Sequence, residues 1–112
     1  MPKNLVVGDV WYAKFPLEED SSKYIERPAI IADVHLPDVA IIKVTKHDPR
    51  ENDQYDTIIV HYNQAKLKRQ STARVSKLVT VDISQILNRK GTLHPEDFKN
   101  VFEQLDKFID EE

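Results

Sequence analysis

The sequence predicts a small, mainly β domain, a barrel or a sandwich, that ends in an amphipathic α-helix. Five short runs are rich in β-branched and aromatic residues and follow one another without a long helical pattern between them. The C-terminal segment instead carries apolar residues at helical spacing. Because 112 residues allow one hydrophobic core, we expect residues 1–112 to form a single domain.

The five strand-like runs are short, and prolines or polar stretches bound them. They cover residues 10–15, 28–34, 39–45, 57–62 and 74–81. The last run alternates in part between polar and apolar residues, as expected for a strand with one face in water. Two long polar stretches, 17–27 and 46–56, are predicted loops, and loops on a rigid scaffold often carry binding residues.

Two helices are predicted after the strands. The segment from Asp82 to Gln85 reads as a capping box that opens a short helix, which Gly91 could terminate. His94 stands at a predicted N-cap, and Pro95 follows at the first helical position, where proline is favoured. We expect the apolar stripe of the second helix to dock on the sheet as core packing. This stripe consists of Phe98, Val101, Phe102, Leu105, Phe108 and Ile109.

Charge is unevenly distributed along the chain. The whole sequence carries −3, yet residues 23–90 hold twelve Lys or Arg against eight Asp or Glu, whereas residues 91–112 hold two against seven. Binding of a polyanion depends on the local field rather than on the sum. The body of the domain is therefore compatible with a basic binding surface, and an ordinary mixed surface explains the charges equally well.

The composition excludes several functional classes. Without cysteine there is no disulfide, thiolate metal site or thiol nucleophile. No apolar stretch approaches the ~20 residues of a membrane span and no signal peptide is present, so we expect a cytoplasmic protein without membrane association. Phosphate loops, zinc-protease motifs and nucleophile elbows are missing. The four histidines are too scattered for a metal site, so we expect no metal or other cofactor.

The remaining candidates are polar residues at predicted strand ends. Arg27 precedes Pro28, which favours an extended backbone and gives the planar guanidinium a fixed direction. Thr45 closes the third run, and Arg74 opens the fifth. In a closed barrel these ends could meet on one rim, although residue type and spacing alone favour ordinary surface positions.

Several short segments stand in an informative order between residues 8 and 109. They are Gly8-Asp9-Val10-Trp11, Arg27-Pro28-Ala29-Ile30-Ile31, Ile41-Ile42-Lys43-Val44-Thr45, the stretch 71–82, and Gly91-Thr92-Leu93-His94-Pro95-Glu96 before the amphipathic helix. None is specific alone. Their order and spacing together resemble the PemK/MazF family of toxin endoribonucleases from type II toxin–antitoxin systems.

The resemblance implies an SH3-like barrel, usually a homodimer, that cleaves single-stranded RNA without a metal. In such enzymes the 2′-hydroxyl of the RNA attacks the adjacent phosphate and leaves a cyclic phosphate. By the same resemblance Arg27 and Thr45 are catalytic residues, and Arg74 falls where some members carry a second active-site arginine. A cognate antitoxin, whose acidic segment occupies the RNA groove, is the implied protein partner.

Further residues are candidates for contact with RNA. Tyr24 could stack on a base, although packing against the barrel explains it at least as well. The other RNA-binding candidates are Lys23, Lys46, His47, Lys68, Arg69 and Ser71. If the reaction needs an acid–base group, His47 or His61 could titrate in the useful range.

Two other functions remain open. A gyrase-poisoning toxin can share the barrel, but that family engages its target with a Trp-Gly-Ile-type tail, and this chain ends Phe108-Ile109-Asp110-Glu111-Glu112. A non-catalytic SH3-like binding module would make Arg27 and Thr45 incidental.

Overall fold

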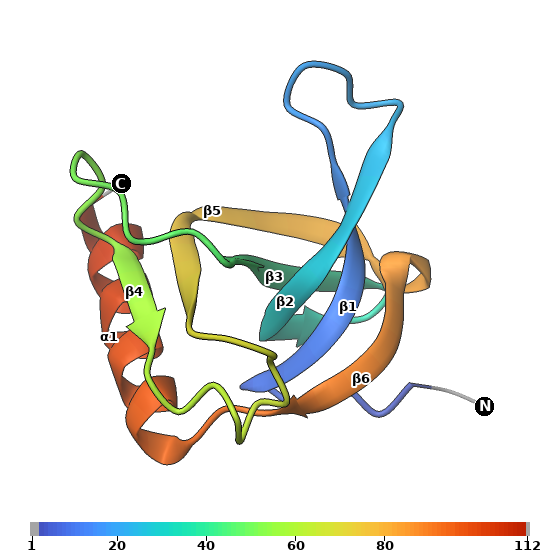
Figure 1. Ribbon diagram of the computed structural model, residues 1–112. Coiled ribbons are helices and arrows are strands. Elements are labelled where there is room, and N and C mark those ends of the chain that lie inside the picture. Colours follow the sequence, from blue (N-terminus) through green and yellow to red (C-terminus); the bar gives the residue numbers. More distant parts are fainter. Residues whose placement is uncertain (1–2, 112) are drawn as a thin grey trace.

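A computed structural model describes residues 3–111 as six strands, one 3₁₀ turn and one α-helix (Figure 1). The elements are β1 (Asp9–Pro16), β2 (Tyr24–His35), β3 (Asp38–Thr45), β4 (Asp56–Ile59), β5 (Ser71–Asp82), η1 (Ile83–Gln85), β6 (Ile86–Thr92) and α1 (Pro95–Glu111). The mainly β prediction with a C-terminal helix is confirmed.

All six strands form one antiparallel sheet in the order β4-β5-β3-β2-β1-β6. The sheet is strongly curved, and the β1–β2 hairpin extends beyond the rest of it (Figure 1). Helix α1 lies against β4 and β5 at one side. Register shifts interrupt the pairing of β1 with β6 and of β3 with both of its neighbours, which accommodates the curvature.

The central strands are buried on both faces. Successive side chains of a strand point to opposite faces. Accordingly, Ile30 and Ile42 join a core that includes Val101 of α1, whereas Ile31 and Ile41 join a second core on the other face. All five are fully buried. Each such side chain contributes about 1.5–3 kcal/mol, which explains why these strands read as nearly continuous apolar runs.

The start of β1 is fixed by Gly8 and Asp9. Gly8 has φ +95°, and a Cβ there would lie 2.6 Å from the ring of Phe98, so a side chain is excluded. The Asp9 carboxylate is buried and accepts hydrogen bonds from Arg89 Nε at 3.1 Å and Thr92 Oγ1 at 2.9 Å. These contacts tie the start of β1 to the end of β6.

The expected helix that extends from Asp82 to Gly91 is wrong. The capping box is present, with Asp82 accepting from Ser84 N and Gln85 accepting from Asp82 N, but it opens only the 3₁₀ turn η1. The chain then continues as β6, because β1 offers a free edge with which it pairs. Gly91 lies inside β6, where a Cβ would approach Ala65 O to 2.7 Å.

The fourth strand ends at Ile59 rather than at residue 62. The backbone N–H groups of Val60 and His61 donate to the two carboxylate oxygens of Asp97, at 2.9 and 2.8 Å. Asp97 is fully buried in the first turn of α1. These two donors therefore bind the helix instead of a neighbouring strand.

Helix α1 begins as expected at Pro95. His94 caps it, since its Nδ1 accepts from Glu96 N at 3.0 Å. The predicted apolar stripe is only partly correct: Val101 and Leu105 are buried. Phe102 and Phe108 are partly buried against the same core, whereas Phe98 and Ile109 are 38% and 54% exposed. No helix among residues 3–111 is long and apolar enough to cross a membrane.

Candidate functional site

An open groove of about 520 Å³ runs between the base of the β1–β2 hairpin, the end of β3 and the segment before β5. The groove is lined by Tyr12, Glu26, Arg27, Pro28, Val44, Thr45, Lys46, His47, Leu67, Lys68, Arg69, Ser71 and Lys90. It brings Arg27 and Thr45 together on one surface, although 17 residues separate them in the chain.

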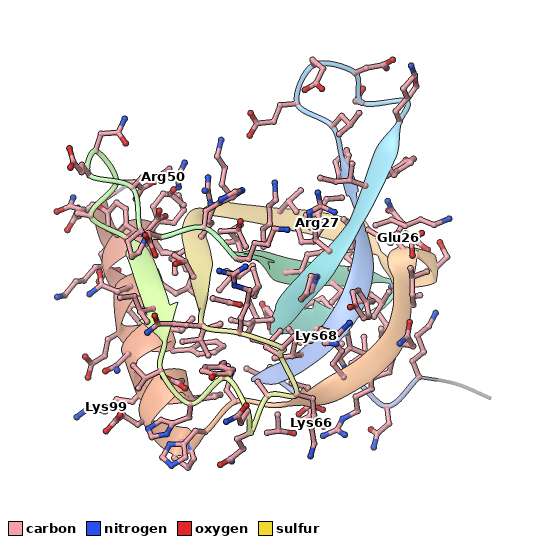
Figure 2. The ribbon with its side chains drawn as sticks, in the orientation of Figure 1. Glu26, Arg27, Arg50, Lys66, Lys68 and Lys99 are labelled. Carbon is pink, nitrogen blue, oxygen red and sulfur yellow. The ribbon has the colours of Figure 1, made fainter. Side chains whose placement is uncertain are left out.

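Arg27 lies within β2, not at the end of a loop. The polar stretch expected to reach residue 27 forms a loop only over 17–23, since Tyr24–Arg27 pairs with β1. The Arg27 side chain is exposed, and its Nη1 donates to the carbonyl of Glu26 at 2.9 Å. Within residues 3–111 no carboxylate forms an ion pair with it. Arg27 lines the groove, and no ion pair in this part of the chain neutralises its charge (Figure 2 labels the side chain).

Thr45 closes β3 as expected and begins a tight turn. Its Oγ1 accepts a hydrogen bond from His47 N at 3.3 Å. From β5, the hydroxyl of Thr72 donates to His47 O at 2.7 Å. Thr72 is only 2% exposed, so the turn is anchored from inside the sheet. In the described part of the chain the Thr45 hydroxyl donates to no acceptor, which leaves its proton available to a ligand.

Cations surround this pair of residues. Lys46 and His47 follow Thr45, while Lys68 and Arg69 belong to the segment that leads into β5 (Figure 2 labels Arg27 and Lys68). Ser71 opens β5 and is 6% exposed; its hydroxyl donates to Arg69 O at 3.0 Å. The groove thus combines a guanidinium, ammonium groups and hydroxyls, a set of donors suited to phosphate oxygens.

Sequence reasoning missed three groove residues with polar side chains: Tyr12, Glu26 and Lys90. Lys90 Nζ lies 4.6 Å from the centroid of the Tyr12 ring, in a cation–π contact. Tyr12 and Lys90 reach the groove through the pairing of β1 with β6, and the unrecognised strand β6 hid this pairing. Glu26 neighbours Arg27 in the chain, but residue type alone did not distinguish it from other surface acids.

Three predicted site residues lie outside the groove lining. Arg74 lies within β5, three residues after its start, and pairs in register with Lys43 of β3. Lys23 and Tyr24 lie at the outer end of the hairpin, where Tyr24 is 50% exposed. His61, the alternative acid–base candidate, is also elsewhere: its ring stacks on that of His94 at 3.8 Å beside the start of α1.

Ion pairs between Arg50 and two aspartates hold the loop that follows Thr45. Arg50 donates to both oxygens of Asp56, at 2.9 and 2.8 Å, and to Asp53 at 2.8 Å. The Asp56 side chain is fully buried, whereas that of Arg50 is 28% exposed. Burial acts to raise the pKa of Asp56, but the hydrogen bonds and charge of Arg50 outweigh it and hold this pKa below its ordinary value.

Within residues 3–111, no group of three or more His, Asp or Glu side chains is placed to hold a metal ion.

Comparison with known proteins places the chain in a family. Residues 7–109 match the family model described as PemK-like, MazF-like toxin of type II toxin–antitoxin system. No curated protein sequence matches significantly. Among solved structures, similarity extends to an endoribonuclease in complex with its cognate antitoxin from Mycobacterial species, at TM-score 0.73 and 12% identity over 96% of both chains.

Two further structures share the fold. The Mycobacterium tuberculosis toxin MazF-mt6 superposes with TM-score 0.68 and 16% identity, over 91% of this chain and 96% of that one. A MazE–MazF structure from Deinococcus radiodurans gives TM-score 0.70 and 11% identity, over 93% of this chain and 94% of that one. At identities this low, the structural similarity establishes the fold alone. The family model, in contrast, matches nearly the whole chain. The protein therefore belongs to the family of PemK-like, MazF-like toxins of type II toxin–antitoxin systems.

Proposed function

We propose that this protein is an endoribonuclease toxin that cleaves single-stranded RNA, mRNA included, through attack of the RNA 2′-hydroxyl on the adjacent phosphate. The observation that carries the proposal is the shared groove of Arg27 and Thr45, with its exposed guanidinium and its available hydroxyl proton. Membership of the toxin family and structural similarity to an endoribonuclease support the same activity.

The reaction needs charge stabilisation more than a protein nucleophile. As the 2′-oxygen bonds to phosphorus and the 5′-oxygen leaves, negative charge accumulates on the non-bridging phosphate oxygens. Arg27 stabilises this charge with a preorganised fork, and Thr45 donates a hydrogen bond to the same phosphate. The products are a 2′,3′-cyclic phosphate and a free 5′-hydroxyl.

Proton transfer is assigned to His47. The pKa of an arginine is too high for it to exchange protons near neutral pH, whereas imidazole titrates in that range. Of the two histidines considered, His47 lines the groove and His61 packs against His94. His47 is therefore the histidine that we propose for proton transfer at a phosphodiester held by Arg27 and Thr45.

The proposal includes two protein partners. The groove is cationic over Lys46, Lys68 and Arg69, so an acidic segment of a cognate antitoxin would compete there with RNA. Similar structures have been solved with an antitoxin. We also propose a homodimer, following the family resemblance.

A cleavage assay tests this function. Purified protein is incubated with single-stranded RNA of mixed sequence in the presence of a chelator, and product ends are identified by mass spectrometry. We expect cuts that leave 2′,3′-cyclic phosphates, and none at a position whose 2′-hydroxyl is replaced by hydrogen. Absence of cutting, or products that carry a 5′-phosphate, would contradict the proposal and favour a non-catalytic binding module.

Thr72→Val is expected to lower kcat by about 10- to 100-fold while KM changes little. Valine matches the shape of threonine but cannot donate to His47 O, so the turn that carries Thr45 and His47 loses its anchor. Thr72→Ser keeps the donor and should retain most activity. Steady-state kinetics of the two variants check this, and equal kcat values for both would exclude a positioning role for the hydroxyl.

A further inference from the structure

Two cations face each other from neighbouring strands beside the groove. Lys43 of β3 is in register with Arg74 of β5. Like charges placed directly opposite one another destabilise a sheet. Sheet stability therefore does not account for this pair.

Neither Lys43 nor Arg74 forms an ion pair within residues 3–111. Arg74 also pairs in register with Asp56 of β4, but both carboxylate oxygens of Asp56 accept hydrogen bonds from Arg50. The Nε–H of Arg74 is buried and has no hydrogen-bond partner in this part of the chain. Lys43 forms no ion pair there. The pair therefore offers two positive charges and an unsatisfied donor.

The surroundings of Lys43 are positive as well. Burial, followed by the charges of Arg74 and Arg27, lowers the pKa of Lys43. Lys77 adds to this effect, and the acid that opposes it, Glu18, is already bound to Lys77 at 2.5 Å. A bound anion would relieve the repulsion among these cations.

We propose that Lys43 and Arg74 form a second phosphate subsite, which holds a backbone phosphate of the RNA next to the one engaged by Arg27 and Thr45. This inference rests on the proposed nuclease function. Lys43 stands two residues before Thr45 on β3, and adjacent strands lie about 4.8 Å apart. A stacked nucleic acid strand carries one phosphate per ~3.4 Å, so both subsites fall within one or two nucleotides of the same backbone. In this assignment Arg74 binds a neighbouring backbone phosphate of the RNA rather than the phosphate that reacts.

Binding of an RNA that cannot be cleaved tests the subsite. The probe is a fluorescent 2′-O-methyl oligonucleotide of mixed sequence, titrated between about 50 and 200 mM salt. We expect Lys43→Gln to weaken binding about fivefold near 100 mM salt and to reduce the slope of log K against log salt by about 0.7, as for one lost contact with a single strand. The matched control is Lys99→Gln, on the exposed surface of α1 away from the groove, which should leave both values unchanged (Figure 2).

The outcomes separate this inference from its alternatives. Lys43→Gln should unfold at the same temperature as the wild-type protein or at a higher one, because repulsion between the two cations is removed. Arg74→Gln removes the other cation and should show the same reduced slope of log K against log salt. An unchanged slope in both variants overturns the subsite. A loss of oligoglutamate binding without loss of RNA binding also overturns it, and assigns the pair to an acidic protein partner. If wild-type protein binds RNA through Lys43 but cuts none, the nuclease function fails while the subsite stands.

Discussion

Arg27→Ala is expected to slow RNA cleavage by about 100- to 1,000-fold under single-turnover conditions. The substitution removes a preorganised donor from the position where negative charge develops, and loss of one such donor has this effect in other enzymes that stabilise an anionic transition state. Within residues 3–111 the Arg27 side chain forms one hydrogen bond, to the neighbouring Glu26 carbonyl, and it is exposed. The fold should therefore not depend on it.

Arg27→Lys separates charge from geometry. Lysine keeps the positive charge but not the planar fork, so we expect it to restore only part of the lost rate. The melting temperatures of both variants should match that of the wild-type protein, and Lys99→Ala should cut RNA at the wild-type rate. If Arg27→Ala retained more than about a tenth of the wild-type rate, the arginine would not be the main electrostatic element of the site.

Arg50→Met is expected to destabilise the protein by about 3 kcal/mol. Removing one partner of a buried ion pair leaves the other charge uncompensated, and the Asp56 side chain is fully buried. The expected loss lies at the lower end of the range for buried ion pairs because Arg50 itself is 28% exposed. For a domain of this size such a loss lowers Tm by roughly 10–15 °C, which calorimetry or denaturant titration will measure. Arg50→Met combined with Asp56→Asn should recover a substantial part of the loss.

The same ion pair predicts a pH dependence. Because the pKa of Asp56 is lowered in the folded protein, its contribution to stability is present above the ordinary aspartate pKa of about 4 and is lost as the pH falls further through the folded value. Unfolding free energies measured from neutral to acidic pH should thus decline less steeply in Arg50→Met than in the wild type. Parallel profiles for the two proteins would mean that Arg50 does not set the pKa of Asp56.

Most of the fold was predictable because local and tertiary preferences agree in the central strands and in α1. Nearly continuous apolar runs such as 28–34 and 39–45 predict strands that are buried on both faces, and the structure has them so. Where the two preferences disagree, prediction failed. The capping box before Ile86 and the glycine at 91 both suggest a helix, yet β6 forms because the free edge of β1 supplies hydrogen bonds that no local pattern encodes.

The site was predictable only in part, and for a similar reason. Arg27 and Thr45 were identified through motif order, and they do line one groove. Lys43, Thr72 and Lys90 were not singled out, since their importance depends on which strands are neighbours. Cross-strand register places Lys43 opposite Arg74, and β5 delivers Thr72 to the turn after β3. Such relations follow from topology and not from residue type or spacing.

The central claim is that Arg27 and Thr45 act on one phosphodiester, and a double-mutant cycle tests it most directly. Single-turnover cleavage rates are measured for Arg27→Ala, Thr45→Val and the double variant. If both side chains stabilise the same phosphate, the double variant should be little slower than the slower single variant, since groups that act as a unit are not additive. Rate losses that multiply, as for independent sites, would contradict the account.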